Sequence, residues 1–195
     1  MNKKLAAALS GGSVLLMALS GCGDDSDTKV NDWAKKVCDQ VQPQLTKIAG
    51  ANASIQQATS GSSKPADVQK TDSAAFQSIS DAYKALGSAV NTAGAPPVED
   101  GEKTQKEAVG ELNTTSAAYA GLKTKVDDLD IKDQAKFADG LKGVADELAK
   151  LSTSGDRALQ KLQSGDVGAA MAKQPGCQRP KTSAPADAGA GAPAA

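Results

Sequence analysis

The stretch PADVQKTDSAAFQSISDAYKALGSAVNTAG, residues 65–94, decides the fold of this 195-residue chain. Its apolar side chains recur at the three- and four-residue spacing of a helix that faces a core. They are Val68, Ala75, Phe76, Ile79, Tyr83, Leu86 and Val90. Pro65 suits the first turn of a helix, and Gly94, followed by Pro96 and Pro97, suits its end. The stretch therefore predicts one long helix with a single apolar face.

Three other segments carry the same apolar spacing. The first consists of Val30, Trp33, Val37, Val41, Leu45, Ile48 and Ile55. Another consists of Val109, Leu112, Tyr119, Leu122 and Val126. The last consists of Phe137, Leu141, Val144, Leu148, Leu151, Leu159 and Leu162. Because the alternation typical of strands does not occur, the sequence predicts an all-α fold.

Individual residues indicate where these helices begin and end. Pro43 lacks a backbone amide proton, so we expect the first helix to be kinked or divided near Gln42. The third helix should start within residues 98–102, where acidic residues suit a helix N-terminus. We expect Asp130 to cap the fourth helix, which should end near Gly165.

These elements predict an up-down four-helix bundle followed by a short fifth helical segment over residues 166–173. Residues 30–177 have the size of one domain. Residues 178–195 are rich in alanine, proline and glycine and contain no large apolar side chain. Such a segment cannot bury enough surface to offset the entropy of ordering, so we expect it to be disordered.

Aromatic and glycine residues give more detailed expectations for the bundle. Phe76 and Tyr83 are seven residues apart on one helix face, so we place both in the core. Trp33 lies near the start of the first helix, where it either closes the end of the bundle or contacts lipid headgroups; we favour the first. Glycines inside the predicted helices indicate either close packing or a groove. These are Gly87, Gly110, Gly121, Gly140 and Gly143.

The N-terminus has the organisation of an export signal, with Lys3 and Lys4 ahead of an apolar run. The run ends in Leu19-Ser20-Gly21-Cys22, which resembles the lipobox of bacterial lipoproteins. The resemblance implies that residues 1–21 are a signal peptide and that Cys22 receives lipid. Residues 22–29 are then a lipidated, solvated tether.

The apolar run also bears on localisation. The run from Leu5 to Leu19 has fifteen residues, which in a helix rise about 22 Å, short of a membrane core of about 30 Å. We therefore expect the lipid on Cys22 to be the only membrane attachment, on the extracytoplasmic face of the cell membrane. The alternatives are an ordinary secretory signal and a protein that is partly secreted.

The other two cysteines, Cys38 and Cys177, form an even pair in an exported protein, which predicts a disulfide. The alternative is two free thiols. In an up-down bundle the fourth helix ends beside the start of the first, so the short fifth segment would carry Cys177 to Cys38. We expect no zinc, because two distant cysteines without histidine are too few ligands.

Composition gives little support for catalysis or nucleic-acid binding. Removal of residues 1–21 leaves 22 − 2 = 20 basic residues against 23 acidic residues. Proteins that bind nucleic acids usually carry an excess of basic residues, so this balance does not suggest a nucleic-acid partner. Motifs for nucleophile elbows, phosphate loops and dinucleotide sites do not occur in the sequence, which also contains no histidine. The acids Asp127, Asp128, Asp130 and Asp133 depart from the EF-hand pattern, and we assign them to helix capping. We predict that the protein is not an enzyme and has no cofactor or metal.

Taken whole, the chain resembles the small exported lipoproteins of actinobacteria, which share an Ala/Gly-rich helical body, two body cysteines and a Pro/Ala tail. The resemblance implies an envelope address and supplies no active site. We therefore expect a structural or protein-interaction module of the cell envelope, with an unknown envelope protein as partner. The alternative is a carrier or sensor that binds a small or lipid-like ligand between the helices.

Overall fold

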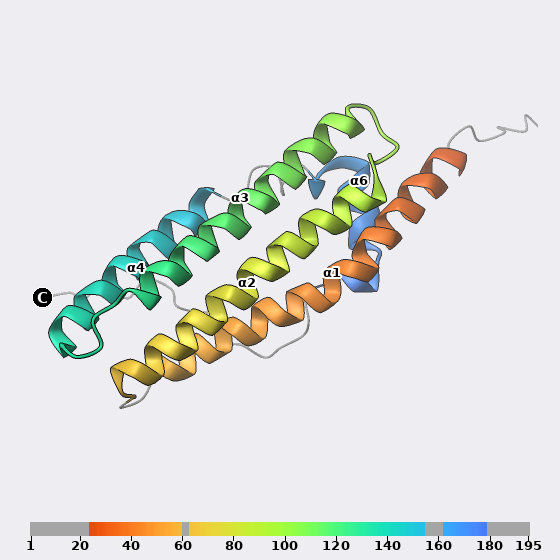
Figure 1. Ribbon diagram of the computed structural model, residues 1–195. Helices are drawn as coiled ribbons and strands as arrows, with labels where there is room; N and C mark the ends of the chain where they lie inside the picture. Colours follow the sequence, from red (N-terminus) through yellow and green to blue (C-terminus); the bar gives the residue numbers. More distant parts are fainter. Residues whose placement is uncertain (1–23, 60–62, 155–161, 179–195) are drawn as a thin grey trace, which may run out of the picture.

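The computed structural model describes residues 24–59, 63–154 and 162–178 (Figure 1). Within these ranges the regular elements are helices, and no strand occurs. They are α1 (Asp24–Thr59), α2 (Pro65–Ala93), α3 (Gly101–Asp127), α4 (Gln134–Ser154), α6 (Gly165–Ala172) and the 3₁₀ turn η1 (Pro175–Cys177). The all-α fold and the short fifth segment are therefore confirmed. Several predictions lie outside the described residues. They concern the signal peptide, Cys22 and the tail beyond Gln178. The expected continuation of the fourth helix over residues 155–161 also lies outside them.

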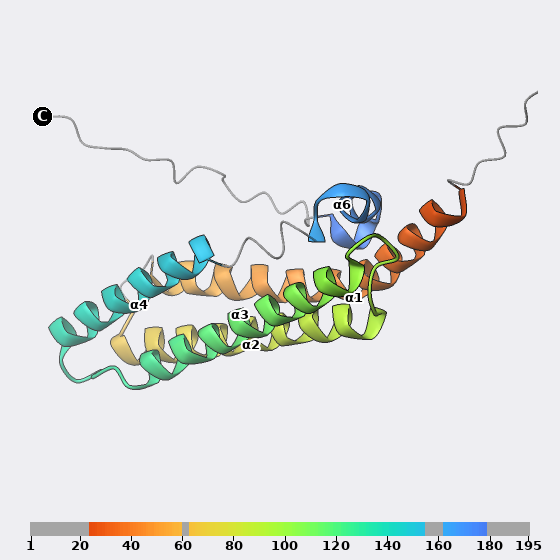
Figure 2. The ribbon, with the colours of Figure 1, turned by 90° about the horizontal axis from the view of Figure 1, so that it is seen from above.

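The helices α1, α2 and α3 run side by side in alternating directions, with α2 packed against both neighbours. Two shorter elements complete the bundle from opposite ends (Figure 2). α4 packs against α3 at one end, whereas α6 and η1 pack against α1 at the other. The fourth position of an up-down bundle is thus filled by two different pieces of chain.

Each end of the bundle has its own apolar cluster. The disulfide half is the end covered by α6 and η1, and its buried apolar residues are Val30, Trp33, Ala34, Val37, Cys38, Leu86, Val90, Ala108, Leu112, Leu162, Val167, Ala170 and Met171. The α4 half is the other end, with Ala51, Phe76, Ile79, Leu122, Val126 and Val144 among its buried residues. Tyr83 packs against both clusters, and Phe76 is only 2% exposed, so both are core residues as predicted.

The ends of α2 agree with the prediction from its sequence. Pro65 is in the first turn, where a missing amide proton leaves no helical hydrogen bond unmade. Gly94 follows the last turn with φ +79°, a conformation that residues with a Cβ rarely adopt. Its amide donates to the Asn91 carbonyl at 3.2 Å and ends the helix.

α1 differs from the prediction in two ways. It begins at Asp24 rather than at Val30, because aspartates are favourable near the positive end of a helix dipole and extend the helix without any core contact. It is also continuous through Pro43, so of the two expected alternatives, a kinked or a divided helix, the division does not occur. Pro43 is exposed, which lets solvent satisfy the carbonyl that loses its amide partner.

The connections at either end of α3 also depend on single residues. α3 starts at Gly101, within the predicted range, after Asp100 in a left-handed conformation with φ +58°. A Cβ on Gly101 would collide with the Pro96 carbonyl, so the close return of this loop requires glycine. The expected cap of α4 is wrong: Asp133 rather than Asp130 accepts hydrogen bonds from the first free amides of the helix, at 3.1 Å each.

Candidate functional site

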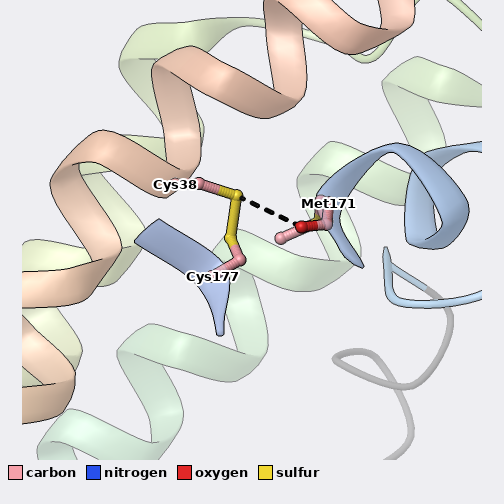
Figure 3. Close-up of a disulfide and its surroundings, with 3 residues drawn as sticks. All are labelled: Cys38, Met171 and Cys177. Atoms are coloured by element: carbon pink, nitrogen blue, oxygen red, sulfur yellow. Dashed lines mark hydrogen bonds between the residues drawn. A yellow bond between two sulfur atoms is a disulfide. The ribbon is translucent and has the colours of Figure 1, made fainter. Parts of the chain in front are cut away.

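The two body cysteines meet as predicted (Figure 3). Cys38 on α1 and Cys177 in η1 form a disulfide with their Cα atoms 4.8 Å apart, and Cys38 is fully buried. The Met171 carbonyl lies 4.0 Å from Cys38 Sγ, a contact rather than a hydrogen bond because a disulfide sulfur carries no proton. Gly176 lets η1 lie this close, since a Cβ there would meet the Cys38 carbonyl.

Trp33 closes the same end of the bundle. It is 5% exposed and its indole Nε1 donates to the Gly94 carbonyl at 2.8 Å. This bond ties α1 to the connection between α2 and α3. Trp33 therefore packs inside the protein, as we favoured, and does not present its ring to lipid.

An open groove runs between α1 and α2 in the α4 half, with a volume of about 710 Å³. Its floor is made of small side chains, and its charged residues are Lys47, Asp67 and Lys70. The small lining residues are Gly50, Ala51, Ser54, Thr71, Ala74, Ala75 and Ser78. A Cβ on Gly50 would have no neighbour within 4 Å, so the groove is open to an incoming group.

The glycines that the sequence singled out lie outside this groove, and only some of them pack closely against a neighbour. Gly87 allows close packing, because a Cβ there would lie 3.1 Å from Asn113 Oδ1 on α3. Gly140 likewise packs against Leu129. Gly110, Gly121 and Gly143 face open space. The groove itself was not predicted, because it depends on small residues of α1 and α2 lying side by side.

A second hollow lies at the connection between α2 and α3 and is also open to solvent. It is lined by Pro96, Val98 and the first two turns of α3, where lysines and glutamates alternate. Both hollows are open to solvent, and neither is an enclosed space between helices.

Asp72 on α2 is a buried carboxyl group that was not predicted from the sequence. It is 4% exposed, and its Oδ1 has no hydrogen-bond partner. Burial alone raises the pKa of Asp72 from its usual 3.8 to about 6. Its position was visible in the sequence, since it lies four residues from both Val68 and Phe76 on the apolar face of the helix.

Of the acids that we assigned to helix capping, Asp133 caps α4, whereas Asp127 pairs with Lys123 within α3. A hydrogen bond from Lys123 holds the pKa of Asp127 below its usual range. The backbone amide of Lys136 does the same for the pKa of the capping residue Asp133. From α2, the Gln69 side chain donates to the Val126 carbonyl at 2.9 Å and the Leu129 carbonyl at 3.1 Å, which ties α2 to the turn that follows α3. Within residues 24–59, 63–154 and 162–178, no group of three or more potential ligands is placed to hold a metal ion.

The polar groups of the described core do not assemble a reactive pair. Ser80 donates to the Ser116 carbonyl at 2.8 Å across the α2–α3 interface, which is a structural bond between two helices. The pKa of Asp72 is raised by burial and not by a neighbouring charge.

No helix in the described part of the chain is long and apolar enough to cross a membrane. No family model, curated protein or solved structure matches the chain.

Proposed function

We propose that the protein is a lipoprotein, anchored by lipid on Cys22 to the extracytoplasmic face of the membrane, that acts as a structural or protein-interaction module of the cell envelope. The observation that carries this proposal is the disulfide between Cys38 and Cys177. Such a bond forms and persists in oxidising compartments outside the cytoplasm. It supports the export implied by Leu19-Ser20-Gly21-Cys22, which precedes α1 almost directly.

The groove between α1 and α2 is the surface we assign to the partner. Small side chains along both helices allow a partner's backbone to approach closely, and Lys47, Asp67 and Lys70 supply charges that orient it. Small-molecule sites usually bury most of the ligand in a concave pocket, whereas both hollows here are open. The geometry therefore favours a protein partner over a small ligand between the helices.

The anchor is tested by replacing Cys22 with alanine in the full chain. Without the thiol no lipid can be attached, so we expect the variant to move from the membrane fraction to the soluble fraction. Ser26→Ala, four residues further on, is the control and should stay with the membrane. Retention of Cys22→Ala on membranes after a carbonate wash would contradict the anchor.

The interaction role is tested by a photo-crosslinking amino acid at Ser54, which lines the groove. We expect a discrete crosslinked species in intact cells. Gly50→Leu should abolish it, because a leucine would extend into the groove from a Cβ that meets no neighbour within 4 Å. The matched controls lie on α3, where Thr114 is exposed and Gly110 also faces open space. Equal crosslinking from Thr114, or no effect of Gly50→Leu, would overturn the assignment of the groove.

A further inference from the structure

The first turns of α1 project beyond the rest of the bundle. Figures 1 and 2 both show this end of α1 extending past the connection between α2 and α3. The side chains of residues 25–29 are all exposed, and Val30 is the first buried residue of the helix, at 5% exposure. From Asp24 to Val30 the helix rises about 9 Å at 1.5 Å per residue.

This projecting segment has the wrong chemistry to lie on a membrane. Its sequence, DDSDTK, contains no apolar side chain, whereas helices that lie in the interface bury an apolar face there. Its acids Asp24, Asp25 and Asp27 outnumber the single base Lys29, and an anionic lipid surface attracts basic segments rather than acidic ones. A helix of this composition stands away from lipid.

The same segment is continuous with the part of α1 that is tied to the bundle. Asn31 Nδ2 donates to the Asp27 carbonyl at 2.8 Å within the exposed helix. A few residues later, Trp33 bonds to Gly94 and Cys38 is joined to Cys177. The projecting turns and the disulfide half therefore form one continuous body.

We propose that residues 24–29 are a rigid spacer that holds the bundle upright above the lipid surface, with the α2–α3 connection facing the membrane and the α4 half pointing away. The proposal rests on the lipid anchor at Cys22, two residues before α1 begins. Lys47 and Ser54, at the two ends of the groove, then stand about 35 and 45 Å along α1 from Asp24. A partner in the groove must therefore reach well beyond the headgroup region.

The test measures energy transfer from the full, natively lipidated protein to a headgroup dye in vesicles of phosphatidylethanolamine and phosphatidylglycerol. A donor dye is attached through Glu99→Cys, in the connection, or Lys64→Cys, at the far end; both positions are exposed. Because about 40 Å of α1 separates Trp33 from Thr59, we expect transfer from position 99 to exceed that from position 64 by about threefold.

Two seven-residue insertions between Lys29 and Val30 sharpen the result. A Gly/Ser insertion removes the rigid connection, so transfer from position 64 should rise towards that from position 99. An Ala/Glu/Lys insertion adds about two helical turns, so transfer from position 99 should fall while that from position 64 stays low. Equal transfer from both positions without an insertion, or no response to the Gly/Ser insertion, overturns the spacer. Protein that fails to float with the vesicles overturns the lipid anchor and, with it, the proposal.

Discussion

The disulfide half and the α4 half close the same three-helix core in different ways. In each half α1, α2 and α3 leave one side of the cluster to be covered by a fourth element. In the disulfide half η1 and α6 cover it, and the bond between Cys38 and Cys177 holds them there. In the α4 half the cover is a longer helix that buries Phe137 and Val144.

The difference follows from the length of chain available. α6 has eight residues, fewer than a helix needs to be stable alone in water, and few of its side chains are large. A covalent bond makes up for that small apolar area. α4 has 21 residues and packs without a disulfide. Its half of the bundle, however, contains Asp72, whose buried Oδ1 has no hydrogen-bond partner. One half gains stability from a crosslink, and the other loses some to a buried charge.

Removing the crosslink should have the largest effect. The disulfide spans 139 residues, and a loop of that size contributes up to about 5 kcal/mol in the chain-entropy model. We expect the double variant Cys38→Ala, Cys177→Ala to lose about 3–5 kcal/mol in urea unfolding. Hydrogen exchange should show that α6 and the start of α1 lose protection before α4 does. A uniform loss across both halves would show that they are not energetically distinct.

Removing the buried charge should have the next largest effect, of opposite sign. Because folding raises the pKa of Asp72 from 3.8 to about 6, the stability that its proton provides is complete below pH 3.8 and is lost as the pH rises through 6. This difference in the pKa of Asp72 corresponds to about 2–3 kcal/mol in the free energy of unfolding at neutral pH. Asp72→Asn should therefore be more stable than the natural chain at pH 8 and not at pH 4, by chemical denaturation. The exposed Asp81→Asn is the control, and a pH-independent effect of Asp72→Asn would argue against a buried charge.

Removing the tryptophan hydrogen bond should have the smallest effect. Trp33→Phe deletes the donor to the Gly94 carbonyl and keeps most of the ring, so we expect a loss of about 1 kcal/mol in the disulfide half. A lower Tm in thermal unfolding would measure it. Gln105→Ala, which removes an exposed bond to the Asn91 carbonyl nearby, should cost less. An equal cost for both variants would mean that burial of the tryptophan bond adds nothing.

Much of this fold could be predicted from the sequence, because the deciding signals are local. The period of α2, the proline at its start and the glycine at its end act within a few residues. The disulfide could be predicted as well, since one pairing remained once Cys22 was assigned to lipid. Trp33 was placed correctly because an aromatic ring near a bundle end has few other places to pack.

The features that escaped prediction depend on contacts between distant segments or on small energetic differences. Asp130 and Asp133 are both reasonable caps, and the path of the preceding loop decides between them. Pro43 leaves α1 continuous because it faces solvent. The apolar spacing of the sequence does not show clearly which way this one residue faces. The groove arises where small residues of α1 and α2 come side by side, a pairing that neither helix reveals alone.

The disulfide has a consequence for how the chain tolerates damage. It joins residues 139 positions apart, so Cys38 and Cys177 close most of the described chain into a covalent ring. A protease that cuts any single bond within this ring opens it without separating the pieces. After such a cut, the chain ahead of Cys38 stays linked to the chain that follows Cys177, and two cuts are needed before any segment between the two cysteines can leave.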